Sequence, residues 1–205
     1  MFLDVKEFLE ELSSVYRDLD RAYQDVAGFY GLSCEGCQDN CCQSPFFVNT
    51  LVEHLYLMEG LHALTEAQKA EVFQKANAYQ SGYSKTSRPE TNFRMFCPLN
   101  RDQKCILYEY RPMMCRVYGV PGVMQSPRGG TVEFPGCQRF GSLGKEITRR
   151  LQRTEYYQRV AQIEANLRKK LVYHQKYKKT IAQAIIDEER EKALIMRGYD
   201  IFEGY

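Results

Sequence analysis

Eight cysteines between residues 34 and 137 are the residues of this sequence that most clearly carry chemistry. They form a first group, a second group and one later residue: Cys34, Cys37, Cys41 and Cys42; Cys97, Cys105 and Cys115; and Cys137. Thiolates held a few residues apart suit soft metals such as zinc and iron. We therefore expect a metal-binding protein, and all eight cysteines are candidate ligands.

The first group has the spacing of a metal-binding turn. Cys34 and Cys37 form a Cys-x2-Cys pair, whose sulfurs can converge on one ion. Cys41 follows after three residues and can supply a third ligand. Neighbouring side chains tend to diverge, so Cys41 and Cys42 either serve different ions or one of them only packs. We rank Cys42 and Cys137 as the weakest ligand candidates.

The thiols leave the metal and the number of sites open. Four thiolates suit a tetrahedral zinc ion, and they suit an iron–sulfur cluster equally well. Eight cysteines could make two four-thiolate sites, or one site with several cysteines that bind nothing. The expected cofactor is therefore zinc or iron, the iron either as an ion or within a [4Fe-4S] cluster.

Cationic and aromatic residues surround Cys115 and could assist a cofactor there. Arg111 and Arg116 flank this cysteine, and guanidinium groups can offset thiolate charge through hydrogen bonds. The alternative for these arginines is a surface salt bridge, for instance with Glu109. Tyr118 is expected to pack around the site.

Composition and charge narrow the class of protein. The chain has 205 residues, 44% of them hydrophobic, which is enough for a real core, and its net charge of +2 predicts neither nucleic acid nor membrane as a partner. Its N-terminus lacks the basic and apolar regions of a signal peptide, and no apolar stretch is long enough to span a bilayer. We expect a cytoplasmic protein, in which grouped thiols favour metal binding over disulfides, with a protein or a small molecule as its partner.

The pattern of apolar residues predicts a mainly α fold. Apolar residues recur at helical spacing over residues 2–28. Asn49 or Thr50 could cap a second helix, and Thr65 is in position to cap a third. The cysteine-rich middle is irregular, with at most one small β-hairpin, over residues 119–134. A long C-terminal helical pattern runs from residue 143 to about residue 196. We therefore expect a metal-binding domain at 1–142 and a helical extension at 143–205, which packs on that domain or on a partner.

At these cysteines the chain resembles the YkgJ-like cysteine-cluster family. The motifs that carry the resemblance span roughly residues 31–137: Cys34-x2-Cys37-x3-Cys41-Cys42, Cys97-Pro-Leu, Cys105-Ile-Leu-Tyr-Glu-Tyr-Arg-Pro112 and Cys115-Arg-Val-Tyr118. The resemblance implies a zinc- or iron-chelating domain whose motif cysteines are the seven up to Cys115, with Cys137 matching less distinctively.

The same resemblance implies an alternative function. Some members of the family are described as iron–sulfur oxidoreductases, and a related cysteine motif in flagellin lysine methylases accompanies a [4Fe-4S] cluster. The alternative is therefore a [4Fe-4S]-dependent redox or transferase enzyme. Methyl transfer itself does not carry over, because this chain matches only the cysteine part of those enzymes.

Overall fold

The computed structural model describes residues 5–35, 37 and 41–196. Helices make up 57% of the structure, which confirms the mainly helical expectation. The chain divides into two compact units, each described here by itself. Unit 1 comprises Met1–Cys41, Thr50–Glu53 and Arg111–Lys176, and unit 2 comprises Cys42–Asn49, His54–Tyr110 and Tyr177–Tyr205.

The secondary-structure elements follow this division. In unit 1 they are α1 (Lys6–Tyr30), α5 (Met113–Val117), β4 (Gly122–Gln125), β5 (Thr131–Phe134), α6 (Gln138–Gly141), β6 (Leu151–Gln152) and α7 (Thr154–Leu171). In unit 2 they are β1 (Phe47–Val48), α3 (Glu66–Lys85), α4 (Pro89–Asn92), β2 (Asn100–Arg101), β3 (Lys104–Cys105), a 3-10 turn (Tyr108–Tyr110), β7 (Lys179–Thr180) and α8 (Ile181–Met196). Two elements have residues in both units, namely a 3-10 turn (Cys41–Gln43) and α2 (Leu51–His62).

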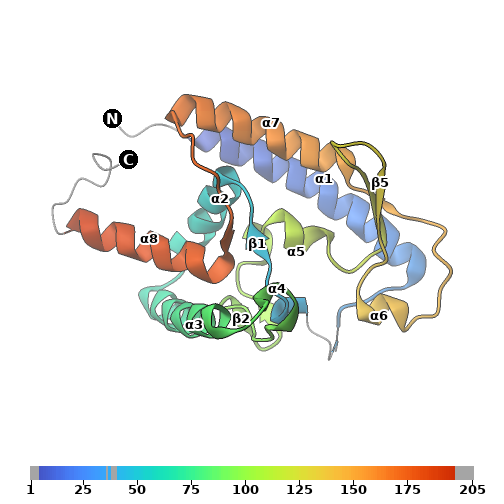
Figure 1. The fold of residues 1–205 in the computed structure, drawn as a ribbon, viewed down its shortest axis with the longest axis horizontal. Coiled ribbons are helices and arrows are strands. Elements are labelled where there is room, and N and C mark those ends of the chain that lie inside the picture. The colour runs from blue at the N-terminus through green and yellow to red at the C-terminus, as the bar shows by residue number, and fades with distance from the viewer. Residues whose placement is uncertain (1–4, 36, 38–40, 197–205) are drawn as a thin grey trace. The chain divides into compact units, whose positions relative to one another are not determined.

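Helices α1 and α7 lie side by side in unit 1 (Figure 1). The apolar stripe that predicted α1 is its buried face, with Leu12 and Leu19 fully buried. Gly28 lies within the helix, and Gly31 ends it in the left-handed conformation that glycine adopts without strain (φ 67°). The chain is thereby released from α1 just before the first cysteines.

Two buried carboxylates organise the start of α2. Glu53 accepts hydrogen bonds from the Tyr16 hydroxyl (3.0 Å) and from the Met113 backbone N–H at the start of α5 (2.8 Å). Glu164 of α7 accepts the N–H groups of Leu51 and Val52 at 3.0 and 2.9 Å. The first N–H groups of an α-helix have no carbonyl partner within the helix, and Glu164 supplies one for those of Leu51 and Val52. Burial, followed by the neighbouring Glu53, raises the pKa of Tyr16 well above its ordinary value.

The predicted hairpin is present, and it belongs to a three-stranded sheet. Strands β4 and β5 pair antiparallel, with Gly122 opposite Phe134. Strand β6 adds to the other edge of β4 in parallel, with Gly122 opposite Leu151. The limit of one small hairpin is wrong, because β2 and β3 form a second hairpin and β1 pairs with β7. Strands of only two residues are too short to show the alternation of apolar and polar residues by which a strand is recognised in a sequence.

Unit 2 is built on α3 and α8, which pack against each other (Figure 1). The expected capping box begins α3: the Thr65 hydroxyl accepts the Gln68 N–H, and the Gln68 side chain accepts the Thr65 N–H. Apolar residues of both helices are buried, among them Val72, Ala76 and Ile185.

The single long C-terminal helix expected from residue 143 is two helices. Residues 143–150 are irregular, α7 ends where Val172 takes a left-handed conformation (φ 54°), and α8 begins only at Ile181. The chain between them supplies β7, whose Thr180 pairs with Phe47 of β1. Backbone pairing with a distant strand therefore overrides the local helical pattern. The expected boundary at residue 142 stays a prediction, because only the separate folding of the two pieces would test it.

Among the helices that the structure describes, none is long and apolar enough to cross a membrane.

The Glu188 carboxylate of α8 contacts two histidines of α2 inside unit 2. Its carboxylate lies 2.7 Å from His62 Nε2 and 3.7 Å from His54 Nε2. Hydrogen bonding to His54 and then to His62 lowers the pKa of Glu188 to about 2, although burial acts in the opposite direction. The sequence assigned these histidines no special role, since α8 and its acidic residue come much later in the chain.

We expect Glu188→Gln to destabilise the protein at neutral pH by roughly 1.5–3 kcal/mol, the range for hydrogen bonds to charged groups. Because folding lowers the pKa of Glu188 from an ordinary 4.5 to about 2, its contribution is complete above pH 4.5 and is lost as the pH falls towards 2. Urea denaturation between about pH 7 and pH 2 should show the stabilities of the two proteins converging at the acid end. Glu189→Gln, at the exposed neighbouring position, is the control, and an equal effect of both substitutions would contradict the assignment.

Candidate metal centre

Two thiols in the structure, Cys34 and Cys97, are influenced electrostatically by cysteines that lie far from them in the sequence. All eight are free thiols. Six of them fall into two sets of three, in each of which the charge of two thiols raises the pKa of the third. The first thiol group, in unit 1, is Cys34, Cys37 and Cys137, and the second thiol group, in unit 2, is Cys42, Cys97 and Cys105.

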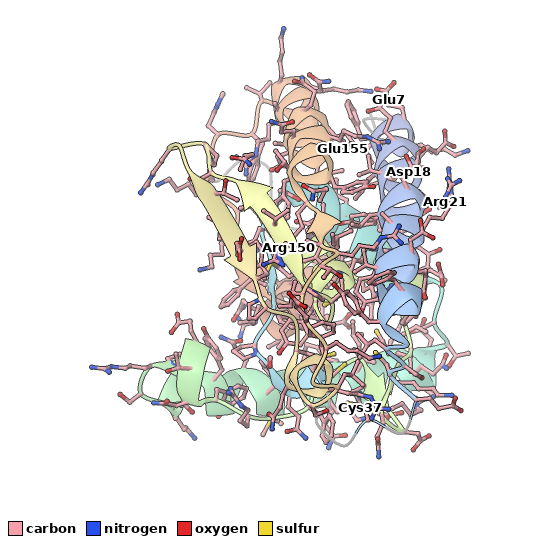
Figure 2. The ribbon with its side chains drawn as sticks, turned by 90° about the vertical axis from the view of Figure 1, so that its right-hand side faces the viewer. Glu7, Asp18, Arg21, Cys37, Arg150 and Glu155 are labelled. Atoms are coloured by element: carbon pink, nitrogen blue, oxygen red, sulfur yellow. The ribbon has the colours of Figure 1, made fainter. Side chains whose placement is uncertain are left out.

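The first thiol group lies beyond the C-terminal end of α1. Figure 2 shows Cys37 there, at the end of the helix opposite Glu7. A turn joins its first two members, because the Cys37 N–H donates to the Cys34 carbonyl at 3.3 Å. Arg139, two residues after Cys137, donates to the carbonyl of Glu35 at 3.2 Å. This bond fastens the segment that carries Cys137 to the turn that carries the other two cysteines.

The ionisation of Cys34 is influenced by the other two thiols of the group. Burial raises the pKa of Cys34, and the Cys137 and Cys37 thiols raise it further. The Arg139 guanidinium and a hydrogen bond from Tyr23 act in the opposite direction. Both therefore favour the thiolate, which is the form that binds a metal.

Tyr23 is a site residue that the sequence did not identify. Its ring belongs to the apolar stripe of α1, so the sequence indicated a packing role alone. In the structure its hydroxyl lies so close to Gly119 (φ +120°) that any side chain at position 119 would collide with it. The Gly119 carbonyl in turn accepts the Cys137 N–H at 2.9 Å. Tyr23 thus contacts Cys34 and also the backbone that positions Cys137.

The second thiol group is assembled by backbone hydrogen bonds. The Cys97 N–H donates to the Cys42 carbonyl at 2.8 Å, and the Asn100 N–H donates to the Cys97 carbonyl at 2.8 Å. Asn100 pairs with Cys105 across the short β2–β3 ladder. Burial, and to a smaller extent the Cys105 and Cys42 thiols, raise the pKa of Cys97, while a backbone hydrogen bond from Leu99 opposes them.

The two remaining cysteines belong to unit 1. Cys41 begins the short 3-10 turn at Cys41–Gln43. The boundary between the two units falls between Cys41 and the adjacent Cys42. Cys115 lies within α5, and Tyr118 is the residue at which that helix ends.

Arg111 and Arg116 share an acidic partner on α1. Both guanidinium groups contact the carboxylate of Asp20, Arg111 at 3.2 Å. Arg116 is buried, its Nε donates to the Arg111 carbonyl at 2.9 Å, and its guanidinium lies 4.0 Å from the centre of the Tyr16 ring. These contacts join α5 to α1. A direct role of the two arginines beside a cofactor stays a prediction.

Across the described residues, no three or more His, Cys, Asp or Glu side chains are arranged so that they could hold a metal ion. The thiols of each group interact without forming a coordination sphere. The chemistry of the donors nevertheless fits a soft metal, since each group offers three sulfurs.

The chain matches no family model, no curated protein and no solved structure.

We expect Tyr23→Phe to raise the pKa of Cys34 further, because the hydroxyl that stabilises its thiolate is removed. In metal-free protein, alkylation of Cys34 by iodoacetamide at pH 8 should slow several-fold, since only the thiolate reacts. Peptide mass spectrometry would follow the rate at Cys34 alone. The matched control, Tyr156→Phe on α7, should leave that rate unchanged. Equal rates in wild type and Tyr23→Phe would contradict a bond between this hydroxyl and the thiol.

Proposed function

We propose that this chain is a cytoplasmic metal-binding protein that holds zinc or iron through cysteine thiolates, at two centres. The observation that carries the proposal is that thiols from distant segments influence one another electrostatically in two places. Cys137 joins Cys34 and Cys37, and Cys42 is hydrogen-bonded through its backbone to Cys97. A buried cysteine that serves only for packing does not need other thiols nearby, whereas a soft metal ion is bound by several sulfurs.

The surroundings of the first thiol group support the proposal. Three neighbouring thiolates repel one another, and a divalent ion would remove that repulsion. Arg139 and the Tyr23 hydroxyl already favour ionisation of Cys34 before any ion is present. Groups that orient and stabilise metal ligands from outside the coordination sphere are typical of metal sites. When bound, zinc or iron would supply positive charge that fixes the irregular segments around Gly119 and Cys34.

Membership of the YkgJ-like cysteine-cluster family is part of the proposal. It rests on the motifs around Cys34 and Cys105 and on the Cys115-Arg-Val-Tyr118 segment. A cytoplasmic location is proposed with it, because all eight thiols are free and reducing compartments keep thiols in that state.

Metal analysis of cysteine variants tests this proposal. Protein prepared without oxygen should contain stoichiometric zinc or iron. Replacing Cys34, Cys37 and Cys137 by alanine should remove one share of that metal, replacing Cys42, Cys97 and Cys105 should remove another, and the six-fold variant should bind none. Circular dichroism would verify that each variant is folded. Full metal content in either three-fold variant would overturn the assignment of that centre.

The second candidate function is a [4Fe-4S]-dependent redox or transferase enzyme. One observation favours it: an open pocket of about 300 Å³ has Cys97 in its wall, so a small molecule could reach a cofactor at the second thiol group. Iron-rich anaerobic expression should then yield brown protein with about four iron and four sulfide ions per cluster. Colourless protein that carries zinc and no sulfide would rule this candidate out.

A further inference from the structure

Two cysteines of the first thiol group lie on one tight turn. The Cys37 N–H donates to the Cys34 carbonyl at 3.3 Å, which is the hydrogen bond that joins the first and fourth residues of a β-turn. The Cα atoms of those two positions lie less than about 7 Å apart in a β-turn, and a disulfide needs about 4.4–6.8 Å between its Cα atoms. The backbone spacing of Cys34 and Cys37 is therefore suited to a disulfide.

Hydrogen bonds to Glu35 hold this turn. The Ser33 hydroxyl accepts the Glu35 N–H at 3.1 Å, at the start of the turn. Arg139, from the segment that follows Cys137, donates to the Glu35 carbonyl at 3.2 Å. Glu35 is thus fixed through both of its backbone groups, directly after Cys34. A turn that is already ordered loses less conformational entropy when a covalent bond closes across it.

Exposure distinguishes this pair from the third member of the group. Cys34 is exposed and Cys37 is partly exposed, so a small molecule in solution can reach them. The Cys137 sulfur instead accepts the Phe140 N–H at 3.4 Å and caps α6. Cys34 and Cys37 are therefore the members of the group that are best placed to react with each other.

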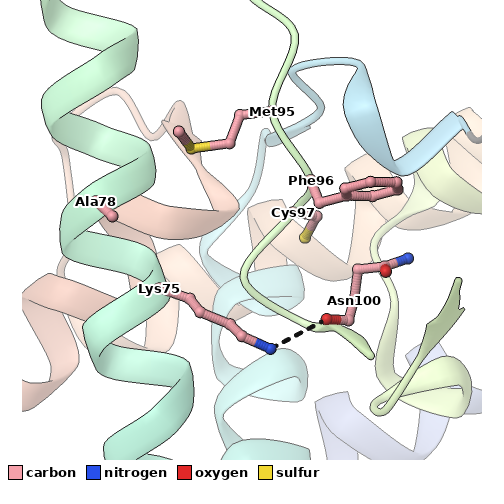
Figure 3. A pocket seen from close by; sticks show the side chains of 6 residues that line it. All are labelled: Lys75, Ala78, Met95, Phe96, Cys97 and Asn100. Carbon is pink, nitrogen blue, oxygen red and sulfur yellow. Dashed lines mark hydrogen bonds between the residues drawn. The ribbon is translucent and has the colours of Figure 1, made fainter. Parts of the chain in front are cut away.

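The second thiol group is built differently. Its members Cys42, Cys97 and Cys105 lie on three separate segments of the chain and include no Cys-x2-Cys pair. Cys97 lines an open pocket together with Lys75 and Ala78 of α3 (Figure 3). A disulfide there would join distant segments instead of closing a local turn.

We propose that Cys34 and Cys37 form a redox-active dithiol, which a small-molecule disulfide such as oxidised glutathione converts into an intramolecular disulfide. In the first step the exposed Cys34 sulfur attacks one sulfur of that molecule, so that a mixed disulfide forms and one small-molecule thiol leaves. In the second step the Cys37 sulfur attacks the Cys34 sulfur, the mixed disulfide breaks and the second small-molecule thiol leaves. Two electrons pass from the dithiol to the small-molecule disulfide, and the two cysteine protons are balanced by those of the two thiols released.

This reaction goes beyond the proposed function, because no metal takes part in it. Disulfides of proteins in reducing compartments are transient, and they serve catalysis or redox sensing. In the cytoplasmic location proposed above, the dithiol is the resting form. The disulfide forms when the ratio of oxidised to reduced glutathione rises, and reduced glutathione reverses the reaction.

Equilibration in glutathione buffers tests the inference. Full-length protein freed of metal by a chelator would be incubated without oxygen at increasing ratios of oxidised to reduced glutathione. It would then be alkylated with iodoacetamide under denaturing conditions and mapped by mass spectrometry. Cleavage after Glu35 separates the two cysteines, so a bond between them appears as two linked peptides. This bond should form with a single midpoint, whereas a bond from Cys34 to Cys137 would overturn the pairing.

The same chain unfolded in urea is the matched reference for the turn. The folded protein should reach its midpoint at a ratio of oxidised to reduced glutathione that is several-fold lower, because the turn already holds the two thiols in place. Equal midpoints would overturn the role of the turn. A higher ratio in the folded protein would show that the fold keeps the two sulfurs apart, and this result would overturn the whole inference.

Cys37→Ser should lose the intramolecular bond and leave Cys34 as a mixed disulfide with glutathione, because the second step has no attacking sulfur. Cys115→Ser is the matched control, since it removes one thiol of the same unit from α5 and should leave the Cys34–Cys37 bond and its midpoint unchanged. Circular dichroism would verify that both variants are folded. Equal loss of the bond in both variants would contradict the inference. These measurements use metal-free protein, so a negative result leaves the metal-binding proposal standing.

Discussion

The burial of the Glu53 carboxylate is the constraint on which the organisation of unit 1 depends. A buried carboxylate is tolerated only when its oxygens are hydrogen-bonded, and two of the partners of Glu53 come from distant parts of the chain. The Tyr16 hydroxyl comes from α1, and the Met113 N–H fixes the first turn of α5. Four residues after α5 begins, the chain leaves it towards Gly119, which holds the Cys137 N–H. The position of Cys137 therefore follows from contacts that begin at Glu53.

Charge balance explains why Arg111 and Arg116 lie where they do. The network around Tyr16 contains two carboxylates, Glu53 and Asp20, and two guanidinium groups. Arg116 also lies over the Tyr16 ring, so that ring is held through its hydroxyl and through its face. In the sequence these arginines are conspicuous because they flank Cys115. Their described contacts instead fasten α5 to α1, and the cation with a described effect on a thiol is Arg139.

Local signals predicted the parts of the fold that local interactions determine. The apolar stripe of α1, the Thr65 capping box and the β4–β5 hairpin were all visible, because each depends on residues a few positions apart. The break between α7 and α8 was not visible, since it depends on β7 pairing with Phe47 and Val48. Glu164 could not be recognised as the group that satisfies the N–H groups of Leu51 and Val52, because more than a hundred positions separate them in the sequence.

The cysteines show the same limit at the level of the site. Spacing alone joins Cys42 to Cys34, Cys37 and Cys41, but a hydrogen bond between the Cys97 N–H and the Cys42 carbonyl places it with the later cysteines. The boundary between the two units thus falls between the adjacent cysteines Cys41 and Cys42.

The two units contain different numbers of cysteines, and this difference matters for their chemistry. Unit 1 holds five cysteines, and three of them, Cys34, Cys37 and Cys137, make up the first thiol group. Unit 2 holds three, and one of them lines a pocket. A thiolate centre with too few protein ligands must complete its coordination with water or a small molecule. Neither thiol group is arranged to hold a metal ion in the part of the chain that the structure describes, so metal binding as proposed would require the thiols of each group to move closer together.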